Sequence, residues 1–143
     1  SEVFEQTPDF VKSILHGTDP ALIPAALQLT STYAWPDQVA ILIKLLDHDD
    51  LTVKRLAAEC LGRIGHPEGA SAILDTWAKV FDQTRQDRIL EHSLLYSLIE
   101  LTTNSTSHDS TVEMMTHVIT NWRDRPAHAY AAIKVLKEIN SLP

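Results

Sequence analysis

A helical hairpin recurs along this chain, and the recurrence restricts the fold more than any other feature of the sequence. The clearest copy runs from Pro36 to Ile64. On both sides of an acidic turn at residues 47–50, apolar residues recur at the i, i+3, i+4, i+7 spacing of an amphipathic helix. The segment therefore predicts two antiparallel helices joined by a tight turn.

The apolar pattern of each helix returns elsewhere in the chain. Over four copies of the second helix, 20 of 24 aligned positions are hydrophobic, where the 44% hydrophobic composition predicts about 11. The aligned second-helix positions are Leu22, Ala25, Ala26, Leu29, Thr30 and Tyr33; Val53, Leu56, Ala57, Cys60, Leu61 and Ile64; Leu90, Ser93, Leu94, Ser97, Leu98 and Leu101; and His128, Ala131, Ala132, Val135, Leu136 and Ile139. The first-helix pattern is Val39, Leu42, Ile43 and Leu46; Ala70, Ile73, Leu74 and Trp77; and Val112, Met115, Thr116 and Ile119.

Proline placement supports the same division independently of hydrophobicity. Pro8, Pro20, Pro36, Pro67 and Pro126 each precede or open a predicted helix, where a missing N–H costs nothing. Pro24 leaves two alternatives, a kink after Pro20 or a helix that begins nearer residue 23. We predict an all-α, right-handed α-solenoid of about four helical hairpins. The eight predicted helices are 8–15 with 20–33, 36–46 with 51–64, 67–81 with 86–102, and 110–122 with 126–140.

Length and charge exclude several classes of function. A chain of 143 residues can bury a sizeable core as one domain without a disulfide or metal staple. The formal charge of -7 disfavours binding to nucleic acid or anionic lipid. The longest apolar stretch, Val39–Leu46, is too short to span a bilayer and contains a lysine, and the N-terminal residues lack the pattern of a signal peptide.

The segment from Leu45 to Leu74 resembles a HEAT repeat of the bilin-lyase-like subtype. One position departs from that subtype, because Lys54 stands where its arginine usually follows the valine, and an arginine comes one residue later. The resemblance implies a solenoid and, more distantly, handling of a bilin or other tetrapyrrole. The matching residues are Asp47, Asp50, Val53, Ala57, Ala58, Leu61, Gly62, Ile64, Gly65, Pro67, Ala70 and Leu74.

The segment from Asp87 to Leu101 resembles part of large planctomycete multi-domain proteins that join a dehydrogenase-like propeller, HEAT repeats and a cytochrome-c-type domain. This resemblance implies that residues 1–143 are a single HEAT-like domain excised from a larger, extracytoplasmic chain; without it we expect a cytoplasmic location. Any haem would lie elsewhere in that chain, because Cys60, the single cysteine, is not part of a Cys-x-x-Cys-His motif.

The sequence offers little that predicts catalysis or metal binding. The seven histidines never pair at i, i+3 or i+4. His16 and His48 occupy equivalent turns beside the acidic residues 47, 49 and 50, which leaves a weak divalent-cation site as an alternative to a solvated turn. Cys60 falls in the apolar stripe and is expected to be inert. We therefore expect no enzyme activity, catalytic residue, metal or cofactor.

The outward face of the second helices is the candidate functional surface, because stacked repeats join these helices into one concave groove. Residues 1–50 carry eight acids and two bases, whereas residues 51–143 carry eleven and ten, so the expected groove is less acidic than the rest. We predict a scaffold that binds a protein partner or flanking domains there; a structural spacer and a bilin-handling, lyase-like module are the alternatives. The candidate residues are Gln28, Arg55, Glu59, Arg63, Arg88, His92, Tyr96, Tyr130, Lys134 and Lys137. Within this set, Glu59 has two possible ion-pair partners one turn away, Arg55 and Arg63.

Overall fold

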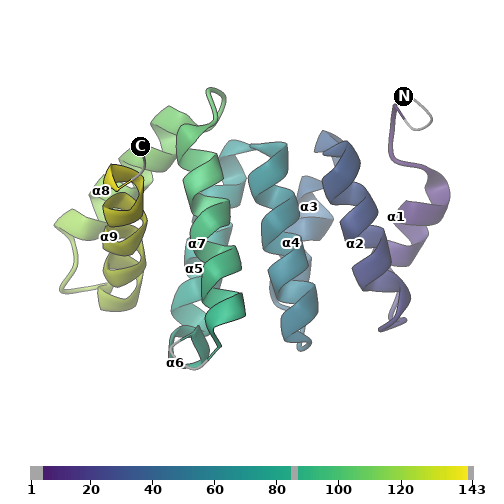
Figure 1. Ribbon diagram of the computed structural model, residues 1–143, viewed down its shortest axis with the longest axis horizontal. Helices are drawn as coiled ribbons and strands as arrows, with labels where there is room; N and C mark the ends of the chain where they lie inside the picture. Colours follow the sequence, from purple (N-terminus) through teal and green to yellow (C-terminus); the bar gives the residue numbers. More distant parts are fainter. Residues whose placement is uncertain (1–4, 85–86, 142–143) are drawn as a thin grey trace.

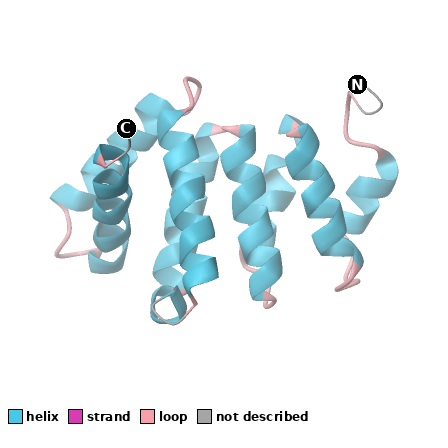
Figure 2. Cartoon of the chain, viewed as in Figure 1, coloured by secondary structure: helices cyan, strands magenta, loops and turns pink. Residues whose placement is uncertain are grey.

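The computed structural model describes residues 5–84 and 87–141 and shows a row of helical hairpins (Figure 1). The second helices of the hairpins lie side by side in one layer, and the first helices form the layer behind them. Within the described residues there are helices and loops but no strand (Figure 2). The hairpins are α1 (Asp9–Leu15) with α2 (Leu22–Tyr33), α3 (Val39–Leu45) with α4 (Leu51–Ile64), α5 (Pro67–Lys79) with α7 (Arg88–Thr103), and α8 (His108–Thr120) with α9 (Pro126–Asn140). The short helix α6 (Phe81–Thr84) and the 3-10 helix η1 (Pro36–Gln38) lie in two of the connections.

The helices of the middle hairpins begin and end at residues suited to those positions. The Asp50 side chain accepts a hydrogen bond from the Thr52 N–H at 2.8 Å, which caps α4. Asp87 caps α7 by accepting from two N–H groups of its first turn. Gly65 ends α4 with a φ of 76°, a left-handed conformation that favours glycine. Asp50 lies in the short turn between α3 and α4, Gly65 lies between one hairpin and the next, and Asp87 ends the longer connection that contains α6.

The predicted solenoid of helical hairpins is confirmed, with small changes at the helix ends. Helices α4 and α9 have the predicted bounds, whereas residues 36–38 form a 3-10 turn before α3. Helix α2 begins at Leu22, so Pro24 falls in its first turn, and of the two alternatives the later start is the one observed. The predicted helix 67–81 ends at Lys79, and 110–122 is shifted to 108–120. The predicted start of the next helix at residue 86 lies outside the described residues.

The core follows the predicted apolar stripes in the middle of the stack but not in α2 and α8. Leu22, expected in the stripe, is 48% exposed, whereas Ile23 and Leu27 are fully buried. In α8, Thr116 is exposed and Val118 is buried. The buried faces of α2 and α8 are thus rotated relative to the predicted ones. The physical reason is that several apolar residues lie close together in both helices, and packing against the neighbouring helix decides which of them are buried.

Small residues allow α4 and α7 to approach closely. A Cβ added at Gly62 on α4 would lie 2.9 Å from Ser97 Cα on α7, closer than real Cβ atoms approach other heavy atoms. Ala58 on α4 and Ser93 on α7 are also buried. The second helices therefore join into one continuous face. Among the helices that the structure describes, none is long and apolar enough to cross a membrane.

Candidate functional site

All ten candidate residues lie on the second helices of the hairpins, α2, α4, α7 and α9. We call the outward surface of these four helices the second-helix face. Seven of the ten side chains are exposed, and Arg55, Glu59 and Lys134 are partly buried because each bonds to a neighbour. The exposed ones are Gln28, Arg63, Arg88, His92, Tyr96, Tyr130 and Lys137.

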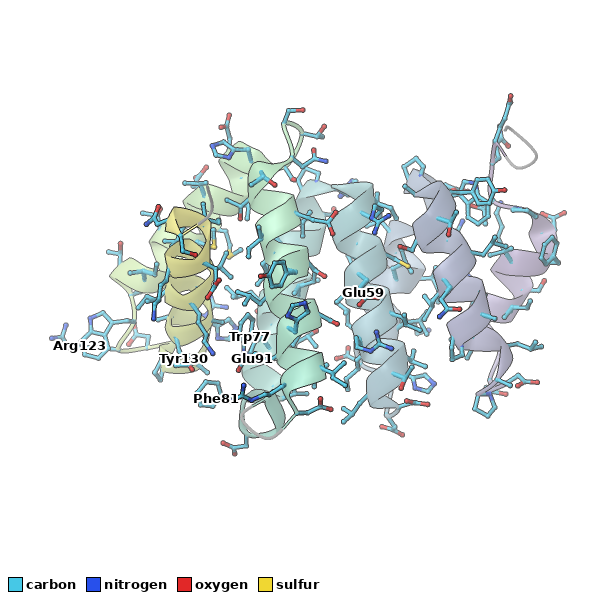
Figure 3. All side chains as sticks on the ribbon, viewed as in Figure 1. Glu59, Trp77, Phe81, Glu91, Arg123 and Tyr130 are labelled. Atoms are coloured by element: carbon cyan, nitrogen blue, oxygen red, sulfur yellow. The ribbon has the colours of Figure 1, made fainter. Side chains whose placement is uncertain are left out.

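The acids in the middle of this face are bound to neighbouring side chains. Glu59 on α4 pairs with Arg55 at 3.3 Å and accepts a hydrogen bond from the Ser93 hydroxyl of α7 at 3.0 Å (Figure 3). Of its two possible partners, Arg55 is therefore the one observed. Arg63 instead lies 3.8 Å from Glu100 on α7. The polar contacts that cross from α4 to α7 hold the two repeats in register and leave these carboxylates with partners.

A second group of contacts joins α7 to α9. Lys134 Nζ donates to Glu91 Oε1 at 2.6 Å, and this hydrogen bond raises the pKa of Lys134. Lys134 Nζ also lies 5.6 Å from the ring centroid of Tyr130, which in turn meets Phe81 edge-on at 5.2 Å. Lys134 therefore stays charged at neutral pH. Its pairing with Glu91 contributes stability below the unfolded pKa of 10.5, and that contribution is lost only as pH rises through the higher folded pKa.

A line of exposed side chains runs along α7 between these two groups. Arg88, His92 and Tyr96 are spaced four residues apart and are therefore one turn from each other on the same side of the helix. The His92 and Tyr96 rings lie 4.3 Å apart with a tilt of 35°. Arg88 makes no ion pair with another described residue. This line is a part of the second-helix face that is available to a partner.

Sequence reasoning missed two residues of this surface, Ile89 and Glu91, and the neighbouring Phe81 on α6. Ile89 is 67% exposed at the start of α7, and Glu91 and Phe81 hold Lys134 and Tyr130. Ile89 could have been found, because it is an apolar residue outside the stripe of its own predicted helix. The roles of Glu91 and Phe81 could not have been found from the sequence, since their partners lie 43 and 49 positions away.

Three of the predicted cation-site residues come together at one edge of the stack. His16, Asp47 and His48 line one cavity of about 420 Å³ near the ends of α1 and α3. His48 Nδ1 accepts from the Asp50 N–H at 3.0 Å, and Asp47 pairs with Lys79 at 3.0 Å. In the described ranges, no group of three or more His, Cys, Asp or Glu side chains could hold a metal ion.

Cys60 lies in the core, as predicted. Its thiol is fully buried and donates to the Leu27 carbonyl at 3.0 Å. Burial, reinforced by the nearby Glu59 carboxylate, raises the pKa of Cys60 from 9.0 to about 12. The thiol is therefore a core side chain with little thiolate at neutral pH.

We expect iodoacetamide at pH 8 to alkylate Cys60 at least about a thousand-fold more slowly in the folded protein than in urea, because the thiolate must be both formed and exposed. Mass spectrometry over a time course measures both rates. Since the folded pKa is raised, the stability from the neutral thiol is present below pH 9 and is lost as pH rises toward about 12. Equal rates in the two states would contradict the buried position.

An ordered row of helical hairpins whose second helices form one face defines the α-solenoid class of proteins. Comparison with protein-family models matches residues 7–91 to HEAT repeats, so the chain belongs to the HEAT-repeat family. Comparisons with curated proteins and with solved structures found no match. HEAT repeats are generally protein-interaction scaffolds and are typically not enzymes.

Proposed function

We propose that this HEAT-repeat chain is a non-catalytic scaffold and that its second-helix face binds a protein partner. The observation that carries the proposal is the exposed line of Arg88, His92 and Tyr96 on α7. Polar contacts beside this line connect α7 to α4 and to α9. Tyrosine and arginine are enriched at the energetic centres of protein interfaces. A rigid face that presents such residues loses little conformational entropy on binding.

The acids of this face have structural partners and are poorly placed for acid–base chemistry. Glu59, Glu91 and Glu100 each lie within ion-pair distance of an arginine or a lysine. A general base must be free to take a proton from a substrate, and these carboxylates already accept hydrogen bonds or face a cation. This arrangement supports binding without catalysis.

A capture experiment tests the proposed function. The immobilised chain is incubated with lysate of the source cells, and bound proteins are quantified by mass spectrometry. We expect Tyr96→Ala and Arg88→Glu each to lower capture of a specific partner about ten-fold, which corresponds to about 1.4 kcal/mol. Free energies of unfolding should stay within about 0.5 kcal/mol, because both side chains are exposed.

Lys44→Glu on α3 is the matched control for Arg88→Glu. Lys44 is exposed on the first-helix layer, and its replacement changes the net charge by the same amount. Capture should be retained in this variant. Capture that is unchanged in Tyr96→Ala and Arg88→Glu, or lost equally in Lys44→Glu, would overturn the assignment of the second-helix face.

Exposed apolar side chains at both ends of the stack support the further proposal that this domain is part of a larger chain. Phe10 on α1 is 54% exposed, and Trp122 and Ile133 in the last hairpin are 50% and 52% exposed. Flanking repeats or domains would bury such surface. A longer chain of this kind is also what the resemblance to the planctomycete proteins implies, and a spacer within it is the alternative function.

The bilin-lyase-like resemblance leads to a third prediction, a tetrapyrrole-handling module, which a spectral titration separates from the scaffold. A scaffold or spacer gives no change in Soret or visible absorbance when haem or a linear bilin is added. A saturable shift at low micromolar ligand that disappears in His92→Ala would instead place a tetrapyrrole on the second-helix face.

A further inference from the structure

A small pocket opens where α4 and α7 begin. It has a volume of about 190 Å³ and is lined by Leu51, Thr52, Arg55, Asp87, Ile89 and Leu90. Three of these residues are aliphatic, and Leu90 is buried while Ile89 is largely exposed. The volume is below the roughly 300–1,000 Å³ of pockets that enclose drug-sized ligands. The pocket is therefore suited to a single aliphatic or aromatic side chain of a larger partner.

The two acids nearest this pocket act as helix caps. Asp87 accepts hydrogen bonds from the N–H groups of Ile89 and Leu90, both at 3.1 Å. Asp50, which directly precedes Leu51, accepts from the Thr52 N–H. Each carboxylate thus faces the positive end of a helix, which offsets its charge. Neither acid forms an ion pair with a described residue.

The cations beside the pocket differ in how they are paired. Arg55 is partly buried and bonded to Glu59, whereas Arg88 is exposed and has no ion-pair partner among the described residues. The other cations near the middle of the face, Arg63 and Lys134, are paired with Glu100 and Glu91. Arg88, which lies in the sequence between the lining residues Asp87 and Ile89, is therefore an exposed cation that can accept a carboxylate from outside without breaking an existing pair.

The line of exposed side chains on α7 sets the length of a fitting segment. From Arg88 to Tyr96 the helix rises about 12 Å, which an extended peptide covers in about four residues. The same line ends on the exposed His92–Tyr96 ring pair, whose rings lie 4.3 Å apart with a tilt of 35° and can contact an apolar side chain. A segment lying along α7 would thus meet a cation and the pocket at one end and two rings at the other.

We propose that the partner presents an acidic, hydrophobic peptide segment of about four extended residues, with one apolar side chain in the pocket at Ile89 and a carboxylate on Arg88. This inference rests on the proposed protein-binding function and adds the chemistry of the partner. Charge complementarity decides that the segment is acidic, because a basic segment would meet the unpaired Arg88 unfavourably, whereas Arg55 is already paired with Glu59.

Two fluorescein-labelled probes test this chemistry by fluorescence anisotropy with the folded chain. One is an acidic hexapeptide with a Leu-Phe centre, and the other is its basic counterpart with lysine in place of each acid. We expect the acidic probe to bind at least about ten-fold more tightly. Arg88→Glu should remove this preference, whereas Lys44→Glu, with the same change of charge, should keep it within about two-fold.

Ile89→Asp probes the pocket separately from the charge of Arg88. Because Ile89 is largely exposed, the substitution leaves the fold intact, and circular dichroism checks this. We expect this substitution to lower the affinity for the acidic probe about ten-fold. An acidic probe in which Ala-Ala replaces Leu-Phe should bind the wild-type chain about as weakly.

Selection from an unbiased displayed peptide library separates failure of this inference from failure of the proposed function. One outcome is that the selected peptides depend on Tyr96, as shown by lost binding to Tyr96→Ala, and yet show no enrichment of acidic residues. That result would overturn the proposal of an acidic segment and would leave the proposed scaffold function standing. Equal binding of the acidic and basic probes would also overturn it. If no selected peptide and no captured protein depends on the second-helix face, both proposals fail.

Discussion

Trp77→Ala is expected to lower the free energy of unfolding by about 3–5 kcal/mol, the largest effect of any single change considered for this chain. Trp77 lies on α5, is fully buried, and belongs to the apolar core. Removing the indole leaves a cavity that the surrounding helices fill only in part. Urea unfolding followed by circular dichroism measures the change, and a fall in Tm on the order of 10 °C should accompany it.

The indole nitrogen of Trp77 makes Trp77→Phe an informative control. Trp77 Nε1 is buried without a hydrogen-bond partner among the described residues, and such a group costs about 1–3 kcal/mol in lost hydration. Phenylalanine retains most of the apolar contact and removes this cost, which partly offsets its smaller volume. We expect Trp77→Phe to lose no more than about 1 kcal/mol. A loss as large as that of Trp77→Ala would show that the N–H is satisfied in solution.

Gly62→Val is expected to destabilise the chain by about 3 kcal/mol or more, because it overfills the contact between α4 and α7. The nearest atoms to an added Cβ include the backbone of Ser97, with Cα at 2.9 Å and O at 3.1 Å. Backbone atoms cannot rotate away as a side chain can, so the two helices must separate. The same measurement in Gly62→Ala should show a loss of about 1–2 kcal/mol, although alanine favours a helix.

Gly69→Ala is the matched control for Gly62→Ala. Gly69 is also a buried helical glycine. The nearest atoms to a Cβ added there belong to the side chains of Leu101 and Leu61 and lie at 3.5 Å, which is an ordinary contact distance. We expect this variant to be neutral or to gain about 0.5–1 kcal/mol from helix propensity. If both alanine variants behaved alike, close approach of α4 to α7 would not explain the need for glycine at position 62.

The sequence predicted the hairpins well because the signals that start and stop a helix are local. Asp50 and Gly65 lie at the two ends of α4, and Pro126 opens α9, so both helices have the predicted bounds. The prediction was less accurate in α2, where Leu22 was expected in the core and is exposed. Alternating small and apolar residues there satisfy more than one helical face, and only the packing partner selects between them.

The candidate surface was predicted in outline. The helical period placed Arg88, His92 and Tyr96 on one side of a helix, and the structure has all three exposed there. The pocket beside Ile89 was not predicted, because its walls come from the starts of two helices that are more than 30 positions apart in the sequence. A single helical period carries no information about the register between two helices.

The amino-acid sequence by itself therefore determined where this chain forms helices, which hairpins repeat and that the repeats belong to the HEAT family. Backbone capping and apolar spacing act within a few residues, so they can be read from the order of the residues. Only the tertiary structure decided that Glu91 binds Lys134, that Gly62 meets Ser97 and that a pocket opens at Ile89. These contacts depend on how one helix slides and rotates against another, which the summed packing of the whole stack determines.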